Sequence, residues 1–181
     1  MTCVIGLVHG GKVYMAADSA SGQDDSWQVR KTLLHKVFQA GEFLIGYTTS
    51  FRMGQLLQYN FHPMPQPEGQ ADLEYMATAF IDAVRAVMKT GGLAEIDKGV
   101  ESAGSFMVGY RGSLYTVGRD YQVNQVADGF DSIGSGSSYA LGAMLALADK
   151  PPPERLLCSL ECAAALCGNV CGPFIIKTIG G

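Results

Sequence analysis

The order of strand and helix patterns along the chain predicts an α+β fold, a four-layer αββα sandwich of two antiparallel sheets flanked by helices. Short apolar strands occur in hairpin pairs, helical patterns fall in two blocks between them, and one strand closes the chain. Parallel βαβ alternation does not fit this order. Because 181 residues suit one core and no low-complexity segment interrupts them, a single domain over residues 1–181 is expected.

The first half of the chain predicts four strands and one helix. The strands are short apolar runs between turn residues, and they cover residues 2–8, 12–18, 33–38 and 43–47. Gly10-Gly11 supplies the positive φ that the first hairpin turn needs, and a polar loop with Gly22 covers residues 19–30. The first two strands are almost continuously apolar, which is typical of a sheet covered on both faces. Thr48-Thr49-Ser50 offers N-cap residues for a helix near 50–60.

A long helix is expected after the proline-containing loop 61–70. Asp72 is expected to cap it and Gly91-Gly92 to end it. Its apolar stripe has helical spacing and consists of Leu73, Met76, Phe80, Val84 and Val87. A segment of mixed character follows at 93–102.

The last third of the chain predicts three strands and two helices. The strands are expected at residues 105–110, 113–117 and 174–179, with a further strand or irregular edge at 121–127. One helix is expected at 139–148, and it is apolar nearly all round, so it should be buried or lie in an interface. Three prolines end it, and Pro153 or Glu154 begins the final helix, which runs to Cys167-Gly168.

The composition favours a subunit of an assembly and disfavours several kinds of partner. Apolar residues make up 48% of the chain and charged residues 17%, which suggests more buried surface than a soluble monomer has. A net charge of −4 without Lys or Arg runs argues against nucleic acid and anionic membranes. Neither a membrane span nor a signal peptide is recognisable. A cytoplasmic location is therefore expected.

The five cysteines are expected to be reduced thiols, and no cofactor or metal is expected. They are Cys3, Cys158, Cys162, Cys167 and Cys171. The odd count argues against a disulfide framework. The last four could be read as metal ligands, but no CxxC pair and no nearby histidine accompanies them, so small apolar residues on a packed helix are the favoured interpretation.

Thr2 is the candidate nucleophile. A threonine hydroxyl needs an adjacent base, and removal of Met1 would give Thr2 one in its own α-amine, whose unperturbed pKa is about 7.7–8.0. A nearby cation would keep that amine neutral by lowering its pKa, and a buried cation needs an anion. Lys36 and Asp18 are the candidates for this pair.

Four motifs resemble those of a known family. The N-terminal TCVIGLVHGGKVYMAADS, together with His35-Lys36-Val37, is similar to the proteasome β-type threonine peptidases, and most closely to bacterial HslV. Ile45 to Ser50 resembles that family's substrate-binding wall. Ile133 to Ala140 carries its GSG turn before a buried helix, and Ala140 to Met144 also looks like lesser-known bacterial and phage relatives of HslV. The resemblance spans nearly the whole chain and implies the N-terminal nucleophile hydrolase fold.

The resemblance implies a role for each catalytic residue. The hydroxyl of Thr2 attacks the peptide carbonyl while its amine acts as base. Lys36 tunes both groups electrostatically, and Asp18 holds Lys36. Ser135 orients the amine, and the backbone N–H of Thr49 stabilises the oxyanion.

The resemblance also implies where a substrate binds. An extended peptide would add as a strand between Ser21-Gly22 and Thr48-Thr49. Tyr47 and Phe51 would line an apolar pocket for the residue before the cut.

This chain departs from the family pattern in three places. The stretch between Asp18 and Lys36 is two residues longer than usual, which leaves Lys31 as an alternative active-site lysine. Thr49 stands where the family usually has glycine. Cys171 and Phe174 replace an aspartate and a serine that support the proteasome active site, although HslV also lacks that aspartate.

The resemblance implies a threonine endopeptidase that degrades unfolded polypeptides inside a homo-oligomeric ring, with a separate ATPase unfoldase as partner. The alternative is a non-catalytic proteasome-like structural subunit on the same fold. A third interpretation takes residues 134–138, before a helix, as a phosphate-binding loop. Neither Gly-Lys-Ser/Thr nor GxGxxG accompanies that loop, so it is the weakest of the three.

Overall fold

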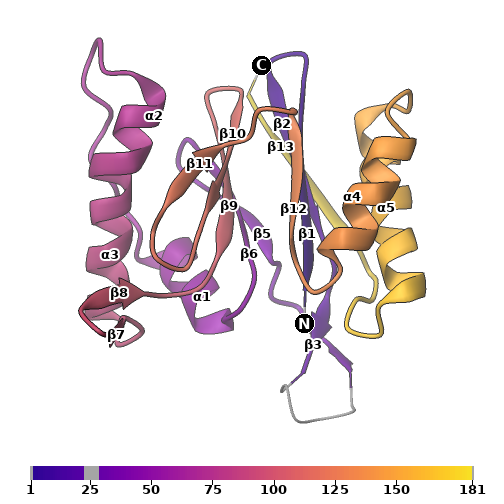
Figure 1. Ribbon diagram of the computed structural model, residues 1–181, viewed down its shortest axis with the longest axis horizontal. Helices are drawn as coiled ribbons and strands as arrows, with labels where there is room; N and C mark the ends of the chain where they lie inside the picture. The colour runs from indigo at the N-terminus through magenta and orange to yellow at the C-terminus, as the bar shows by residue number, and fades with distance from the viewer. Residues whose placement is uncertain (1, 23–28, 181) are drawn as a thin grey trace.

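The first hairpin forms the centre of a four-stranded antiparallel sheet (Figure 1). The computed structural model describes residues 2–22 and 29–180, so residues 23–28 of the expected loop 19–30 lie outside the description. The hairpin consists of β1 (Cys3–His9) and β2 (Lys12–Ala17), which pair antiparallel. The edge strands are β12 (Phe130–Gly134) beside β1 and β13 (Ile175–Ile179) beside β2.

A second antiparallel sheet has five strands in the order β11-β10-β9-β6-β5. In chain order they are β5 (Val37–Ala40), β6 (Phe43–Tyr47), β9 (Phe106–Tyr110), β10 (Ser113–Val117) and β11 (Val123–Gln125). Two small ladders lie outside both sheets and consist of β3 (Ala20–Ser21) with β4 (Arg30–Lys31), and β7 (Glu95–Asp97) with β8 (Val100–Ser102).

The two sheets face each other across a buried apolar layer. Residues of both contribute to it, namely Val4, Val13, Met15, Ala17, Val37, Leu44, Met107 and Leu114. Gly6 and Gly46 lie directly against side chains in the layer between the sheets. A Cβ on Gly6 would fall 2.5 Å from the sulfur of Met107, and one on Gly46 would fall 2.5 Å from the sulfur of Met15. The missing side chains therefore let large neighbours from the opposite sheet fill the layer.

Helices cover the outer face of each sheet, as Figure 1 shows. The five-stranded sheet carries α1 (Phe51–Tyr59) and a long helix made of α2 (Asp72–Tyr75), the π-helical turn η1 (Met76–Phe80) and α3 (Ile81–Thr90). The four-stranded sheet carries α4 (Ser137–Ala146) and α5 (Pro152–Leu166). None of the helices in the described part of the chain is long and apolar enough to cross a membrane.

The predicted α+β class with antiparallel sheets is confirmed, but several elements differ from expectation. The strand expected at 33–38 is β5 at 37–40, because Thr32 Oγ1 accepts a hydrogen bond from Leu34 N (3.0 Å) and the chain bends there, leaving Leu33 98% exposed. Asp72 is the first residue of α2 rather than its cap, which is Ala71. The strands β3, β4, β7, β8 and β12 were not predicted.

The boundaries of the last two helices also move. The helix expected at 139–148 covers Ser137–Ala146, and the final helix begins at Pro152. The apolar helix α4 is buried on only one side of the single chain, since Leu145 is 70% exposed. The helix was expected either to be buried or to lie in an interface. The first of these expectations is wrong for the single chain.

Replacing Gly46 by alanine should destabilise the fold, because the new methyl group would overlap Met15 and Val4 between the sheets. The expected loss in unfolding free energy is about 1–3 kcal/mol, measured by urea denaturation. Gly142→Ala in α4 is the matched control. Nothing lies within 4 Å of a Cβ built there, so it should stabilise by roughly 0.5–1 kcal/mol. Equal effects of the two substitutions would contradict the close approach of the sheets.

Candidate active site

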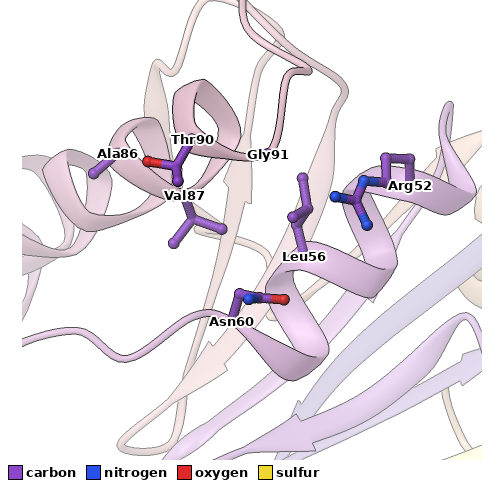
Figure 2. Close-up of a pocket in the computed structure, with 7 residues that line it drawn as sticks. All are labelled: Arg52, Leu56, Asn60, Ala86, Val87, Thr90 and Gly91. Atoms are coloured by element: carbon purple, nitrogen blue, oxygen red, sulfur yellow. The ribbon is translucent and has the colours of Figure 1, made fainter.

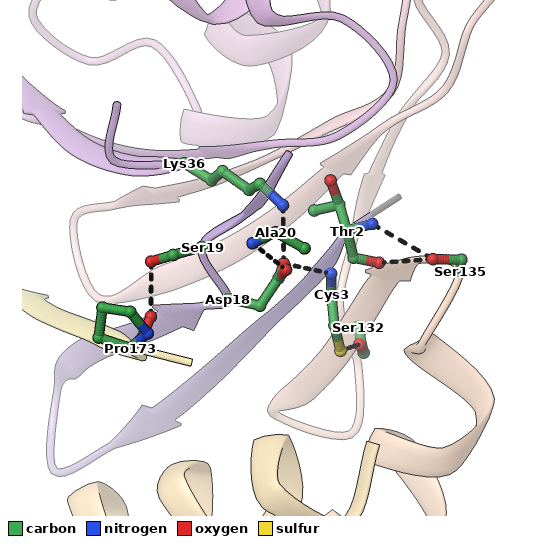
Figure 3. A network of polar contacts seen from close by, with 9 residues as sticks. All are labelled: Thr2, Cys3, Asp18, Ser19, Ala20, Lys36, Ser132, Ser135 and Pro173. Atoms are coloured by element: carbon green, nitrogen blue, oxygen red, sulfur yellow. Dashed lines mark hydrogen bonds and ion pairs between the residues drawn. The ribbon is translucent and has the colours of Figure 1, made fainter. Parts of the chain in front are cut away.

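Thr2 lies buried immediately before β1, where the turn after β12 holds its backbone (Figure 3). Thr2 N donates to Ser135 Oγ (3.2 Å), and the Ser135 hydroxyl donates to Thr2 O (3.2 Å). Gly136 N also donates to Thr2 O (3.3 Å). Gly134 has φ +100°, and a Cβ there would fall 2.3 Å from Thr2 O. The GSG turn therefore needs glycine in order to pack against Thr2.

Asp18 follows β2 and accepts three hydrogen bonds with its carboxylate (Figure 3). Oδ1 accepts from Cys3 N (2.8 Å) and from Lys36 Nζ (2.9 Å), and Oδ2 accepts from Ala20 N (2.8 Å). These donors compensate for the loss of water around a residue that is 1% exposed. Because Oδ1 joins Cys3 N to Lys36 Nζ, the ammonium group lies within a few ångströms of the backbone next to Thr2.

Lys36 is also 1% exposed, and its backbone is fixed to the end of the second sheet. Lys36 O accepts a hydrogen bond from Tyr47 N (3.0 Å). Burial lowers the pKa of its ammonium group, while the charge of Asp18 acts in the opposite direction. The alternative lysine, Lys31, lies exposed in β4, so Lys36 is the one of the two that contacts Asp18.

Thr49 lies at the bend between β6 and α1. Thr48 N donates to Ser105 O (3.2 Å), and the side chain of Ser50 accepts from Met53 N (3.3 Å) as the N-cap of α1. Between them Thr49 has φ +73°, in the left-handed region that favours glycine. The backbone here thus has the conformation that suits a glycine, although this chain carries a threonine.

The expected substrate-binding residues lie around this bend and at the end of β3. Ser21 pairs with Arg30 of β4, and Gly22 is exposed. Tyr47 lies in the core beneath α1, while Phe51 and Thr48 are partly exposed. Hydrogen bonds thus connect Thr2 to Ser135 and Asp18 to Lys36. Thr49 and Ser21 are linked to these groups indirectly. Tyr47, two residues before Thr49, donates its N–H to Lys36 O, and Ala20, next to Ser21, donates its N–H to Asp18.

Ser132, Cys3 and Ser19 support the network, although the sequence did not point to them as site residues. Ser132 Oγ donates to Val4 O (2.9 Å) and lies 3.8 Å from Cys3 Sγ. Burial raises the pKa of the Cys3 thiol to about 12. Ser19 fixes the segment after β2, because its N–H donates to Cys171 O (2.9 Å) and its hydroxyl to Pro173 O (2.5 Å). The position of Ser19 directly after Asp18 is the sequence feature that could have identified it as a supporting residue.

Among residues 2–22 and 29–180, no three His, Cys, Asp or Glu side chains are placed to hold a metal ion. In the turn expected as an alternative phosphate-binding loop, the N–H of Gly136 and the hydroxyl of Ser135 form hydrogen bonds with the backbone of Thr2.

A pocket of about 350 Å³ lies between α1 and α3, where Arg52, Leu56 and Asn60 face the end of α3 (Figure 2). None of its lining residues belongs to the predicted site.

No protein-family model and no curated protein matches the sequence. Solved structures are similar in fold. Thiobacillus denitrificans BPH is 18% identical with a TM-score of 0.81, over 98% of this chain and 97% of that chain. Eukaryotic HslV from Trypanosoma brucei is 16% identical with a TM-score of 0.69, over 99% of each chain. Anbu, an ancestral beta-subunit from Yersinia bercovieri, is 15% identical with a TM-score of 0.66, over 99% of this chain and 82% of that one. The chain therefore has a proteasome-like fold.

Asp18→Asn should destabilise the protein strongly, because it removes the negative charge that pairs with the buried ammonium of Lys36. Removing one partner of a buried pair costs about 3–5 kcal/mol, which urea denaturation would detect. Asp82→Asn is the control, since Asp82 pairs with Arg85 on the surface and should lose at most about 1 kcal/mol. A loss for Asp18→Asn no larger than the control's would contradict the buried ion pair.

Native Cys3 should resist alkylation, because its buried thiol has a pKa of about 12 and stays protonated near pH 8. Peptide mass spectrometry after iodoacetamide treatment at pH 8 should find Cys3 unmodified in the folded protein. It should be modified after denaturation. The half-buried cysteines of α5, Cys158 and Cys162, provide the internal comparison. Rapid native labelling of Cys3 would contradict its burial.

Proposed function

We propose that this chain is a threonine endopeptidase of the N-terminal nucleophile type, with the four-layer αββα architecture of that class. The observation that carries the proposal is the convergence of two hydrogen-bonded networks at the start of β1. One joins Thr2 to Ser135, and the other brings Lys36 and Asp18 to the backbone of Cys3. The proteasome-like fold supports it.

The proposed reaction begins after removal of Met1, which converts Thr2 N from an amide into an amine. That amine accepts the hydroxyl proton of Thr2, and Oγ forms a bond to the carbonyl carbon of the peptide. Collapse of the tetrahedral intermediate breaks the C–N bond, and the leaving amine takes the proton. Water then attacks the ester, losing its proton to the amine of Thr2. The hydroxyl leaves with that proton, and the enzyme is restored.

Lys36 has an electrostatic role in this proposal. A positive charge beside the amine disfavours its protonated form, so the amine's pKa falls and more of it is the free base near neutral pH. Asp18 holds Lys36 with a carboxylate that accepts three hydrogen bonds, so in this proposal the base is the amine of Thr2 and not Asp18. Ser135 orients Thr2 N through the hydrogen bond described above.

The proposed oxyanion donor is the backbone N–H of Thr49. Its left-handed conformation costs a non-glycine residue roughly 1–2 kcal/mol, so the fold must hold it in place. The Ser50 cap and the bond from Thr48 to Ser105 do this. An extended substrate would lie between Ser21-Gly22 and Thr48-Thr49 and would present its carbonyl to this N–H.

We further propose that the subunit works in a homo-oligomeric ring in the cytoplasm, on unfolded polypeptides delivered by a separate ATPase unfoldase. Support comes from the outer helix layer of the four-stranded sheet. Large apolar side chains are exposed on α4 and α5, namely Tyr139, Leu145, Leu157 and Leu166. Exposed apolar surface of this kind favours contact between copies.

A second candidate function is a non-catalytic structural subunit. Cys171 and Phe174 stand where proteasome subunits carry a supporting polar pair, which favours this alternative. The backbone of Cys171 serves to bind Ser19 N, so this segment still braces the end of β2. Both candidates need the same fold, and only activity distinguishes them.

Thr2→Ala should abolish peptide hydrolysis, because alanine still permits removal of Met1 but has no nucleophile. Activity on fluorogenic peptides and on casein should fall at least about 10³-fold, with intact mass confirming the mature N-terminus in both proteins. Thr2→Ser, which keeps a hydroxyl behind a removable methionine, is the matched control and should retain measurable activity. Full activity in Thr2→Ala would exclude Thr2 as nucleophile.

A threonine-directed covalent inhibitor should label the mature chain once, on its N-terminal peptide. Epoxomicin is the first compound to use, because it is bound in a structure of Thiobacillus denitrificans BPH. Intact mass should show one adduct per chain for wild type and none for Thr2→Ala. A mature chain that remains unlabelled and hydrolyses no peptide would support the structural subunit instead.

A further inference from the structure

A cluster of three aromatic rings lies at the end of β6, next to the bend that carries Thr49. The ring of Tyr47 packs against Phe38 (centroids 6.2 Å apart) and against Phe51 (6.1 Å, edge to face). A side chain that lines an open pocket is accessible to solvent, but Tyr47 is only 4% exposed. Its ring therefore fills the space between β6 and α1.

The position of this ring is fixed by α1. Gly54 faces Tyr47 so closely that a Cβ there would fall 2.2–2.6 Å from three ring carbons. The helix thus rests on the ring at van der Waals distance only because residue 54 lacks a side chain. Ser50 holds the start of α1 through Met53 N (3.3 Å), which places Phe51 beside the same ring. The ring of Tyr47 therefore cannot move without disturbing the helix.

In the proposed binding mode, the cluster lies beside the side chain of the substrate residue before the cut. Tyr47 N binds Lys36 O (3.0 Å), and Tyr47 precedes Thr49 by two residues, so the ring belongs to the wall beside the proposed oxyanion donor. When the scissile carbonyl points at Thr49 N–H, the residue before the cut has its Cα one bond away. Its side chain then meets the end of β6 and the start of α1.

We propose that Tyr47, Phe38 and Phe51 close this subsite, so that the enzyme cuts after glycine, alanine or serine and discriminates against large residues. This inference rests on the proposed peptidase activity and specifies its substrate class. It also revises the expected pocket, because Tyr47 fills the pocket that it was expected to line. A closed wall rejects large side chains, since each extra group must displace packed atoms.

The direct experiment compares fluorogenic peptides that differ only in the residue before the scissile bond, with mature wild-type protein. We expect kcat/KM for alanine to exceed that for leucine or phenylalanine at least about tenfold. Mapping of casein fragments by mass spectrometry should give the same preference. Preferred cleavage after leucine, phenylalanine or tyrosine would overturn the inference and leave the proposed function intact. Absence of hydrolysis of every peptide by the mature chain would overturn the proposed function itself, and the inference with it.

Two variants test which ring closes the subsite. Tyr47→Ala should raise kcat/KM for leucine and phenylalanine peptides at least about tenfold relative to alanine peptides. If Tyr47→Ala does not fold, Phe51→Ala gives the same test at a partly exposed position. Tyr59→Ala, which removes an exposed ring from the last turn of α1, is the control and should keep the wild-type preference. A folded variant at 47 or 51 with the wild-type preference would contradict that ring's role.

Discussion

The carboxylate of Asp18 is the group on which the rest of the site depends. It receives the ammonium of Lys36 from the second sheet and the N–H of Cys3 from the first strand, both on Oδ1. A single buried oxygen thus holds the ammonium group near the backbone that follows the proposed nucleophile. The N–H of Ala20 binds the other oxygen, and the three donors together compensate for the burial of the carboxylate. A buried ion pair contributes little net free energy to folding. The contacts of this pair instead hold Lys36 near the start of β1.

The sheet packing explains why these groups meet at one end of the molecule. β1 and β2 form the middle of the four-stranded sheet, and glycines at positions 6 and 46 let side chains from the opposite sheet close the gap between them. Both sheets therefore lie close enough for Lys36, just before β5, to reach Asp18, just after β2. The GSG turn after β12 then approaches Thr2 from the other side.

The bend at Thr49 connects the proposed chemistry to the proposed substrate selection. The same short segment holds Thr49 in a left-handed conformation and packs Phe51, the first residue of α1, against the ring of Tyr47. The proposed oxyanion donor and the proposed side-chain selection thus both depend on one short connection between a strand and a helix. In that proposal, a change in ring size there alters selectivity without touching Thr2, Asp18 or Lys36.

The sequence alone determined the α+β class, the N-terminal hairpin, and Thr2, Asp18, Lys36 and Ser135 as candidates, because apolar periodicity and turn chemistry are local and the motifs are short. It did not determine β12 or the true start of β5, since a hydrogen bond within residues 32–34 and pairing with distant β1 decide those boundaries. It left Lys31 and Lys36 both open, and only the tertiary fold places Lys36 on Asp18. It also predicted Tyr47 as a pocket wall, whereas packing against Gly54 buries its ring. Which side chain fills a given space depends on contacts between segments far apart in the chain, and no local pattern records them.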